Sequence, residues 1–401
     1  MLKETLKRNE GITLLALAVM VIALSIIAGI SINELKGNNG IIKNTLTAKE
    51  KTDQIQEDEN ALLEKKYPSG STEENVDKLP TGNGTIPYLP NNDFSYKEGD
   101  LDKGLVIKDK EGNEYVWVEV PFTIYNNATY NSNGANKPSS SADWENIEKC
   151  LKEYTSDYSD SSYNDRNTSF LELYKKMLRS VYRNGGFWVG RYEAGYELGK
   201  NEAPRNFGAD TGTEQPTTQQ MVIKKNAYPY TWVRYSQAQE LATGMNYENC
   251  TSSLMFGIQW DLVLKFFETK NKATKSELTS DSTERGNYIN NKWNITNANA
   301  KYSKDYGKSF TDCPYPKQST SEFALLTTGA DESFSVMNIY DIAGNVWELT
   351  LEFASNSSPC VFRGGSFGTS GTCCAKYRFC DTIDDYLSGV GFRVGLWRDN
   401  I

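Results

Sequence analysis

A run of 21 residues without a charged side chain, from Ile12 to Ile32, is the strongest constraint on this chain. As a helix rising 1.5 Å per residue, the run spans roughly 30 Å, the thickness of the hydrocarbon core of a bilayer. Basic residues precede the run and Glu34 follows it, which predicts a cytoplasmic N-terminus. A cleaved secretory signal would have a shorter apolar core. We therefore expect a single-pass membrane protein that crosses the cell membrane through residues 12–32, with its C-terminal domain extracellular.

The residues at the start of this run, Gly11-Ile12-Thr13-Leu14, resemble the processing site of type IV prepilins. In that family a peptidase cuts after the glycine, and the apolar helix stays with the mature protein. The resemblance implies cleavage between Gly11 and Ile12, and association with a pilin-like assembly. Pilins usually carry Glu five residues after the cut, where this chain has Ala16. A plain single-pass anchor is therefore the alternative interpretation of residues 1–35.

Three segments of different composition follow. Residues 36–66 mix apolar residues with many charges, which predicts a partly exposed helical stalk. Residues 67–98 contain several Pro and Gly, which predicts a flexible linker. Residues 99–401 alternate short β-rich runs, a few helical patterns and long polar stretches. This alternation predicts a single α+β domain.

The composition argues against several classes of function. The 401-residue chain contains no histidine, which removes His-dependent nucleophilic pairs, imidazole bases and histidine-ligated zinc. Its 43 basic and 52 acidic residues give a net charge of −9, which argues against a nucleic-acid partner. The seven cysteines include no zinc-type CxxC pair, and an odd number leaves at least one free thiol. Catalysis by carboxylates alone stays open.

Periodicity predicts the elements of the C-terminal domain. Two β-rich runs flank a turn at residues 110–113, which predicts a hairpin of 105–107 with 115–120. Residues 187–192 predict a further strand. Apolar residues recur at helical spacing in four places, where we expect helices: residues 144–154, 169–181, 236–245 and 258–267.

Three local features indicate structural roles directly. Glycines that permit a positive φ predict tight turns at Gly344-Asn345 and Gly364-Gly365. Two arginines beside glycines, Arg363 and Arg393, are expected to hold buried carboxylates or carbonyls through the planar guanidinium. Three aromatic residues are expected in the core rather than at a ligand: Trp347, Phe362 and Phe392.

Four motifs follow one another along this domain: Gly186–Glu193 (GFWVGRYE), Asn338–Glu348 (NIYDIAGNVWE), Phe362–Phe367 (FRGGSF) and Gly391–Val394 (GFRV). Together they resemble the signature of sulfatase-modifying-factor domains, the family of the formylglycine-generating enzymes. The resemblance covers residues 100–401. It implies a C-type-lectin-like fold, which is a loop-rich α+β body with a central antiparallel sheet.

Formylglycine-generating enzymes oxidise a substrate cysteine with two cysteines and bound copper. The position of the family's first cysteine is Thr369 in this chain, and only Cys374 falls at the position of the second. Two thiolates must converge on one copper(I) ion, so we do not expect this activity. An oxidase of the same superfamily with other ligands stays as an alternative, and no catalytic residue is assigned.

The resemblance also bears on metal binding. Asn345 and Glu348 lie in the segment that corresponds to the family's metal-binding loop, and their oxygens would suit a structural calcium ion together with backbone carbonyls. A hydrogen-bonded turn with a satisfied Glu348 is the alternative interpretation. Calcium is the only cofactor that the sequence indicates.

Residues 367–390 lie between the third and fourth motifs. Some bacterial and phage proteins with this fold are targets of diversity-generating retroelements, which rewrite AAC-type codons at the first two positions. Such codons cannot yield Lys, Glu, Gln, Met or Trp, and Lys376 is the single member of that set among these 24 residues. The segment therefore predicts a diversified ligand face, with an ordinary surface loop as the alternative. The expected contact residues are Phe367, Thr369, Thr372, Cys373, Phe379, Asp381, Ile383, Asp384 and Tyr386.

Together these features predict a surface-displayed, adhesin-like or receptor-like binding protein. Its partner is expected to be a protein or glycan on another cell, a phage or a host. Two alternatives stay open: an oxidase of the sulfatase-modifying-factor superfamily, and a minor pilin with a structural head.

Overall fold

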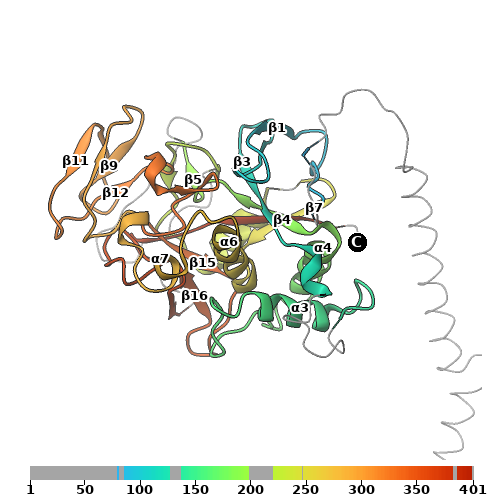
Figure 1. The fold of residues 1–401 in the computed structure, drawn as a ribbon. Helices are drawn as coiled ribbons and strands as arrows, with labels where there is room; N and C mark the ends of the chain where they lie inside the picture. The colour runs from blue at the N-terminus through green and yellow to red at the C-terminus, as the bar shows by residue number, and fades with distance from the viewer. Residues whose placement is uncertain are drawn as a thin grey trace, which may run out of the picture. The chain divides into compact units, whose positions relative to one another are not determined.

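The computed structural model describes residues 79–80, 85–126, 137–197, 220–245, 247–382 and 386–399 (Figure 1). The predicted membrane span, the stalk and the processing site at Gly11 and Ile12 lie outside these residues. Within the described ranges, no helix is both long and apolar enough to cross a bilayer.

Two sheets form the body of the domain. The first has six antiparallel strands in the order β1-β2-β3-β4-β19-β7. Its strands are β1 (Ser95–Glu98), β2 (Val106–Lys108), β3 (Glu114–Glu119), β4 (Gly186–Gly190), β19 (Val394–Arg398) and β7 (Cys250–Leu254). The second has the order β17-β16-β15-β18 and is antiparallel except between β15 and β18. Its strands are β17 (Arg378–Asp381), β16 (Cys360–Arg363), β15 (Trp347–Thr350) and β18 (Val390–Phe392).

Helices and short ribbons complete the described part. The α-helices are α3 (Trp144–Tyr154), α4 (Leu171–Asn184), α5 (Tyr235–Thr243), α6 (Gly257–Thr269) and α7 (Lys275–Thr279). Short 3₁₀ turns are η1 (Phe122–Tyr125), η2 (Thr283–Arg285) and η3 (Glu332–Phe334). The small strands are β5 (Gly195–Tyr196), β6 (Tyr228–Pro229), β8 (Trp293–Ile295), β9 (Lys301–Ser303), β10 (Thr311–Asp312), β11 (Tyr315–Lys317), β12 (Leu325–Leu326), β13 (Ser335–Val336) and β14 (Ile339–Tyr340). In Figure 1, β9, β11 and β12 project from the body.

The predicted secondary structure is confirmed in its main elements. The β2-β3 hairpin and the α3 helix lie where periodicity places them. Helix α4 begins and ends slightly later than expected. It ends only at Gly185, because this glycine adopts the left-handed conformation, with a φ of 65°. The mixture of sheets and segregated helices confirms the α+β class.

The predicted linker differs from the structure over its last part. Residues 95–98 form β1, and Tyr88 and Phe94 are buried in the core. The ring of Tyr88 meets Trp117 edge-on at 5.5 Å between ring centroids, so this part of the chain is fixed to the first sheet. The Pro and Gly residues that predicted a flexible linker therefore precede or punctuate a packed segment.

Helix α6 connects the two sheets. Ten of its residues are buried, and in Figure 1 it lies beside β15 and β16 near the centre of the domain. Gln259 packs against Gly395 of β19, where an added Cβ would lie 3.0 Å from the amide nitrogen. On the other side, Asp261 pairs with Arg363 of β16 at 2.7 Å. A helix buried on two sides needs this nearly continuous apolar sequence.

Arg393 joins three of the four motifs. Its guanidinium donates to Glu348 at 2.6 Å, to the Tyr340 carbonyl at 2.7 Å and to the Gly190 carbonyl at 2.9 Å. The prediction that Arg393 would hold a buried carboxylate and carbonyls is therefore confirmed. The motifs that are far apart in sequence meet because they share one buried cation.

The predicted turns are also confirmed. Gly344 and Asn345 have φ values of 75° and 58°, and Gly364 and Gly365 have values of 87° and 78°. The Gly344 N–H donates to the Gly364 carbonyl, so the two turns bond to each other. Glycine is needed at these points because an added Cβ on Gly344 would lie 2.5 Å from a backbone oxygen.

Three buried carboxyl groups surround Arg393, more than one guanidinium can neutralise. Burial raises the pKa of Asp341 to about 6 and that of Glu348 to about 7. It also raises the pKa of Glu193 well above its usual value, and the neighbouring Asp341 and Glu348 charges add to that rise. The folded domain therefore holds protons here that the unfolded chain releases.

We expect the free energy of unfolding to fall as the pH rises from about 4.5 to about 7. Below this window the carboxyls are protonated in both the folded and the unfolded chain, and their contribution to the free energy of unfolding is fully present. Within it, the folded chain alone keeps the protons, and the contribution is lost as the pH passes the folded pKa values. Urea unfolding of the full chain at pH 5, 6 and 7 measures the trend. A Glu193→Gln variant should show a flatter curve, and stability that rises with pH would contradict this account.

Candidate functional site

Within the segment 367–390, residues 378–381 form β17, an edge strand of the second sheet. Before β17, the segment is tied down from beneath, because the indole N–H of Trp260 in α6 donates to the Ala375 carbonyl at 2.9 Å. The Lys376 ammonium donates to the Asp157 carbonyl at the same distance. The residues just before β17 are therefore supported by the body of the fold.

Side chains of β17 alternate between two faces, as in any strand. Phe379 faces outward and is 47% exposed, and Tyr377, two residues earlier, is 42% exposed. Beneath them lies a buried aromatic layer. The Trp347 ring lies 5.9 Å from that of Tyr377 and 6.1 Å from that of Phe379, and Phe362 lies 6.1 Å from Phe379. The outward face of β17 thus presents two aromatic rings on a rigid base.

After β17, Tyr386 and Leu387 contact residues from a distant part of the chain. The guanidinium carbon of Arg234 lies over the ring of Tyr386, 5.2 Å from the centroid of that ring. The ring centroids of Tyr386 and Trp232 are 6.4 Å apart. The Trp232 N–H donates to the Leu387 carbonyl at 3.1 Å, and the Leu387 side chain is 45% exposed. Residues 232–234 therefore support the turn from a distant part of the chain.

On the opposite face of β17, an ion cluster replaces the aromatic residues. Arg378 pairs with Asp261 and with Glu352, each at 2.9 Å. Arg363 of β16 pairs with the same two carboxylates at 2.7 and 3.1 Å. All four side chains are buried, and two cations balance two carboxylates. The expected carboxylate-holding role of Arg363 is confirmed, and Arg378 shares it.

The predicted contact residues other than Phe367 fall into three groups. Phe379, Asp381 and Tyr386 lie in the surface just described, and Thr372 is exposed on the preceding turn. Thr369 and Cys373 are half-buried: the Thr369 hydroxyl accepts from the Ser366 N–H, and the Cys373 carbonyl accepts from Tyr288. Ile383 and Asp384 lie outside the described residues.

Phe367 is a correction to the predicted contact set. Its side chain is 2% exposed and packs with Leu325 and Val346 in a small core cluster. The position follows the Gly364-Gly365 turn, which directs the chain inward before it reaches the surface again. A buried phenyl ring at this place holds the small ribbons against the sheet and is not available to a ligand.

Four surface residues escaped the sequence analysis: Tyr377, Leu387, Trp232 and Arg234. Tyr377 lies two residues before Phe379, so the prediction of a strand at 378–381 would have placed both side chains on the same face. Leu387 adjoins the predicted Tyr386. Trp232 and Arg234 come from a segment more than 130 residues upstream of the turn, and no local pattern connects the two segments.

The two residues considered for calcium have protein partners. The Asn345 side-chain oxygen accepts from Asn287 and from the Leu326 N–H, both at 3.0 Å, and its amide donates to Glu193 at 2.7 Å. Glu348 is paired with Arg393. Neither side chain presents an uncommitted oxygen, so the residues fit the hydrogen-bonded turn better than a metal site. Among the described residues no group of three or more Cys, Asp or Glu is arranged to hold a metal ion.

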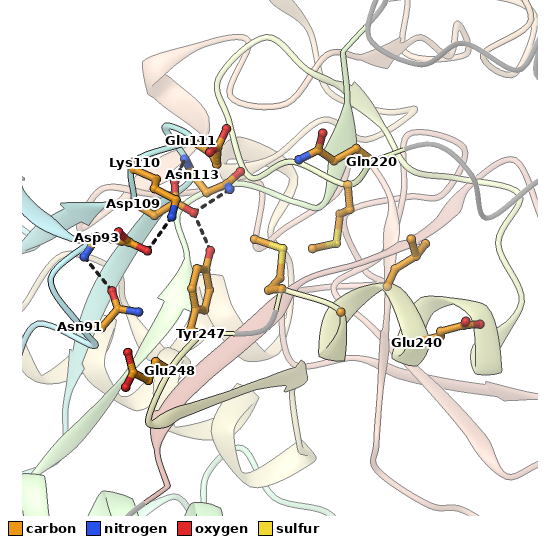
Figure 2. Close-up of a pocket in the computed structure, with 14 residues that line it drawn as sticks. Asn91, Asp93, Asp109, Lys110, Glu111, Asn113, Gln220, Glu240, Tyr247 and Glu248 are labelled. Carbon is orange, nitrogen blue, oxygen red and sulfur yellow. Dashed lines mark hydrogen bonds and ion pairs between the residues drawn. The ribbon is translucent and has the colours of Figure 1, made fainter.

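A separate polar pocket of about 560 Å³ lies between the β2-β3 turn and the end of α5 (Figure 2). Figure 2 shows Tyr247 directed at Asp109, to which its hydroxyl donates at 2.7 Å. Asn113 occupies the same carboxylate through its side-chain and backbone nitrogens, each at 2.8 Å. No residue of the segment 367–390 lines this pocket, and Asp109 is already engaged by its neighbours.

All seven cysteines lie in the described residues, and none of them forms a disulfide. Cys374 is buried, and burial raises its thiol pKa. Cys373 and Cys380 are partly exposed.

No protein-family model and no curated protein matches this sequence. Among solved structures, the Treponema denticola variable protein 1 is similar at 14% sequence identity, with a TM-score of 0.30. The match covers 53% of this chain and 85% of that one.

We expect neighbouring positions of β17 to differ sharply in their effect on stability. Arg378→Met leaves Asp261 and Glu352 with one cation instead of two, and breaking such a buried pair costs about 3–5 kcal/mol. Tyr377→Ser changes an exposed position and should cost about 0.5 kcal/mol or less. Urea unfolding of both variants measures the difference. Equal losses would show that the surface of β17 is part of the core.

Proposed function

We propose that this chain is a ligand-binding protein displayed on the cell surface, and that its contact surface is built by β17 and the 386–387 turn. The observation that carries the proposal is the distribution of exposed large hydrophobic side chains. Six are found in the described residues, and three of them, Tyr377, Phe379 and Leu387, belong to the segment 367–390. Exposed apolar side chains gathered on one surface are typical of interaction sites.

The chemistry of these side chains suits binding. Tyr and Phe offer large contact area and lose little conformational entropy when they are fixed. Here they rest on Trp347 and Phe362, which limits their motion before a ligand arrives. Binding surfaces are pre-organised in this manner, because ordering side chains during association costs affinity.

The alternation of β17 also supports diversification of this surface. Arg378 is fixed in the ion cluster, whereas Tyr377 and Phe379 have no buried polar role. Lys376, the one residue that rewritten AAC codons cannot yield, is bonded to the Asp157 carbonyl and is a scaffold position. A segment in which support and contact alternate can vary at the contact positions without losing the fold.

Surface display belongs to the same proposal and rests on the uncharged run Ile12–Ile32. The contact surface lies near the C-terminus of the chain, far in sequence from that run. Such an order would place the tether before the domain in the sequence and the binding segment within its last part.

Sequencing this locus across many isolates tests the diversified surface. We expect substitutions at codons 377, 379, 381 and 386, at adenine-templated positions, and constancy at codons 374, 375 and 378. A nearby reverse-transcriptase gene would accompany this pattern. If codons 367–390 are as constant as the RGGS and GFRV motifs, diversification is wrong, and an invariant binding domain remains.

Randomising single codons tests the same surface without a known ligand. In a displayed library of the full chain, we expect codons 377 and 379 to accept most residue types with little loss of protease resistance. Codon 378 should accept almost none, because a replacement without a positive charge leaves two buried carboxylates with a single cation, Arg363. Deep sequencing before and after protease selection measures the tolerance. Equal tolerance at all three codons would contradict the assignment of contact and support positions.

A further inference from the structure

The hydrogen-bonding direction of β17 follows from its neighbours. The Trp347 N–H donates to the Gly389 carbonyl at 2.8 Å, so Trp347 points its backbone groups at β18. Adjacent residues of a strand point their backbone groups to opposite sides. Glu348 and Thr350 therefore face β16, and they bond to the residues opposite them in that strand.

The same alternation carries across β16 to the edge of the sheet. The residues of β16 that lie opposite Glu348 and Thr350 face back toward β15, which leaves Phe362 facing β17. Phe362 pairs with Phe379, so the backbone of Phe379 is bonded inside the sheet. The N–H and C=O groups of Arg378 and Cys380 consequently point away from the sheet.

Nothing in the described part of the chain bonds to these outward groups. Lys376 lies two residues before Arg378, so its backbone groups point to the same side, and its N–H donates to the Leu278 carbonyl at 3.0 Å. At Arg378 and Cys380 no backbone hydrogen bond comes from outside the sheet among the described residues. This edge is an open row of donors and acceptors.

The other edges of the two main sheets are protected. Strand β1 has charged Lys97 and Glu98 and a bulge in its register, both of which discourage a further strand. At β7, the Leu254 N–H donates to the Gln239 side chain of α5 at 3.0 Å. Each edge is therefore closed by charge, by irregularity or by a bonded neighbour.

Strand β18 is closed as well, because the Phe392 carbonyl accepts from the Ala194 N–H at 2.8 Å. Strand β17 has no bulge in its pairing with β16 and no proline. Its one cation, Arg378, turns inward to the ion cluster. Among the described residues, β17 is the one of these four edges that has no bonded neighbour, no bulge and no outward cation, and its segment also carries the exposed aromatic rings.

We infer that β17 binds an extended segment of a partner polypeptide, which adds to the sheet as a fifth strand. The inference rests on the proposed function and names its partner class. Main-chain hydrogen bonds to Arg378 and Cys380 would supply affinity that does not depend on the partner's sequence. Alternate side chains of the added strand would lie over the face of Tyr377 and Phe379, which would supply specificity.

This arrangement separates two tasks within one strand. The contact side chains can change while the backbone groups stay the same. A glycan offers hydroxyl groups without the regular alternation of N–H and C=O that the edge presents, so an extended peptide fits the edge better.

A library of random twelve-residue peptides displayed on phage, selected against the full chain, provides the probe. We expect selected peptides to bind wild type and Cys380→Ala alike, and to lose at least tenfold in affinity for Cys380→Pro. Proline removes the outward N–H and leaves the bonds to β16 intact, which edge strands tolerate. Phe379→Ala should weaken the same peptides through the lost side-chain contact. Urea unfolding checks that Cys380→Pro is as stable as Cys380→Ala.

The backbone of the peptide gives a second readout that needs no variant. N-methylation at successive positions of a selected peptide should abolish binding at every second residue and be tolerated between them. Hydrogen exchange of the Arg378 and Cys380 amides should slow when the peptide binds.

Each other outcome overturns part of the account. If Phe379→Ala weakens binding but Cys380→Pro does not, the surface binds and strand addition is wrong. If neither variant matters, the proposed binding surface is wrong as well. A library that yields no binder also contradicts strand addition, because backbone bonding should accept many sequences. Sedimentation that shows a wild-type dimer, lost in Cys380→Pro, would assign the edge to a second copy of the chain.

Discussion

The ion cluster of Asp261, Glu352, Arg363 and Arg378 is the constraint on which the rest of the site depends. It joins α6 to two neighbouring strands and lies away from solvent. Removing four charges from water costs several kcal/mol for each ion, and only complete pairing offsets this. The register of β17 against β16 is thereby fixed, because a slip of one residue would turn Arg378 outward and bury the wrong side chain. The same register places Tyr377 and Phe379 on the exposed face of the strand.

A second polar centre has the same logic on a larger scale. Arg393, Glu348 and the Asn345 turn lie where the motifs of the sequence meet. These groups bond to the backbone of several segments, so they place loops that have little apolar surface of their own. A loop-rich domain with modest hydrophobic content can be held in one arrangement by such bonds, because each unsatisfied buried group would be costly.

Much of this could be predicted from the sequence, and the limits have physical reasons. Local sequence patterns are sufficient to predict helices α3 and α6, the β2-β3 hairpin and the positive-φ turns. The roles of Arg363 and Arg393 followed from their chemistry. Local patterns cannot show which residues of the segment 367–390 face inward. Phe367 and Phe379 are the same residue type in the same segment, yet one is buried and one is exposed. Trp232 and Arg234 reach the surface only through tertiary packing.

The two-residue period of β17 has a consequence for the number of surfaces that the chain can offer. Variation at an outward position multiplies the set of distinct surfaces, whereas variation at an inward position such as Arg378 multiplies the set of chains that fail to fold. Outward and inward positions alternate along the strand. The number of possible surfaces therefore grows as the product of the residue types allowed at the outward positions, while changes that prevent folding stay confined to the inward positions. Under the proposed function, the geometry of one short edge strand would set how many binding specificities a single gene can encode before stability limits it.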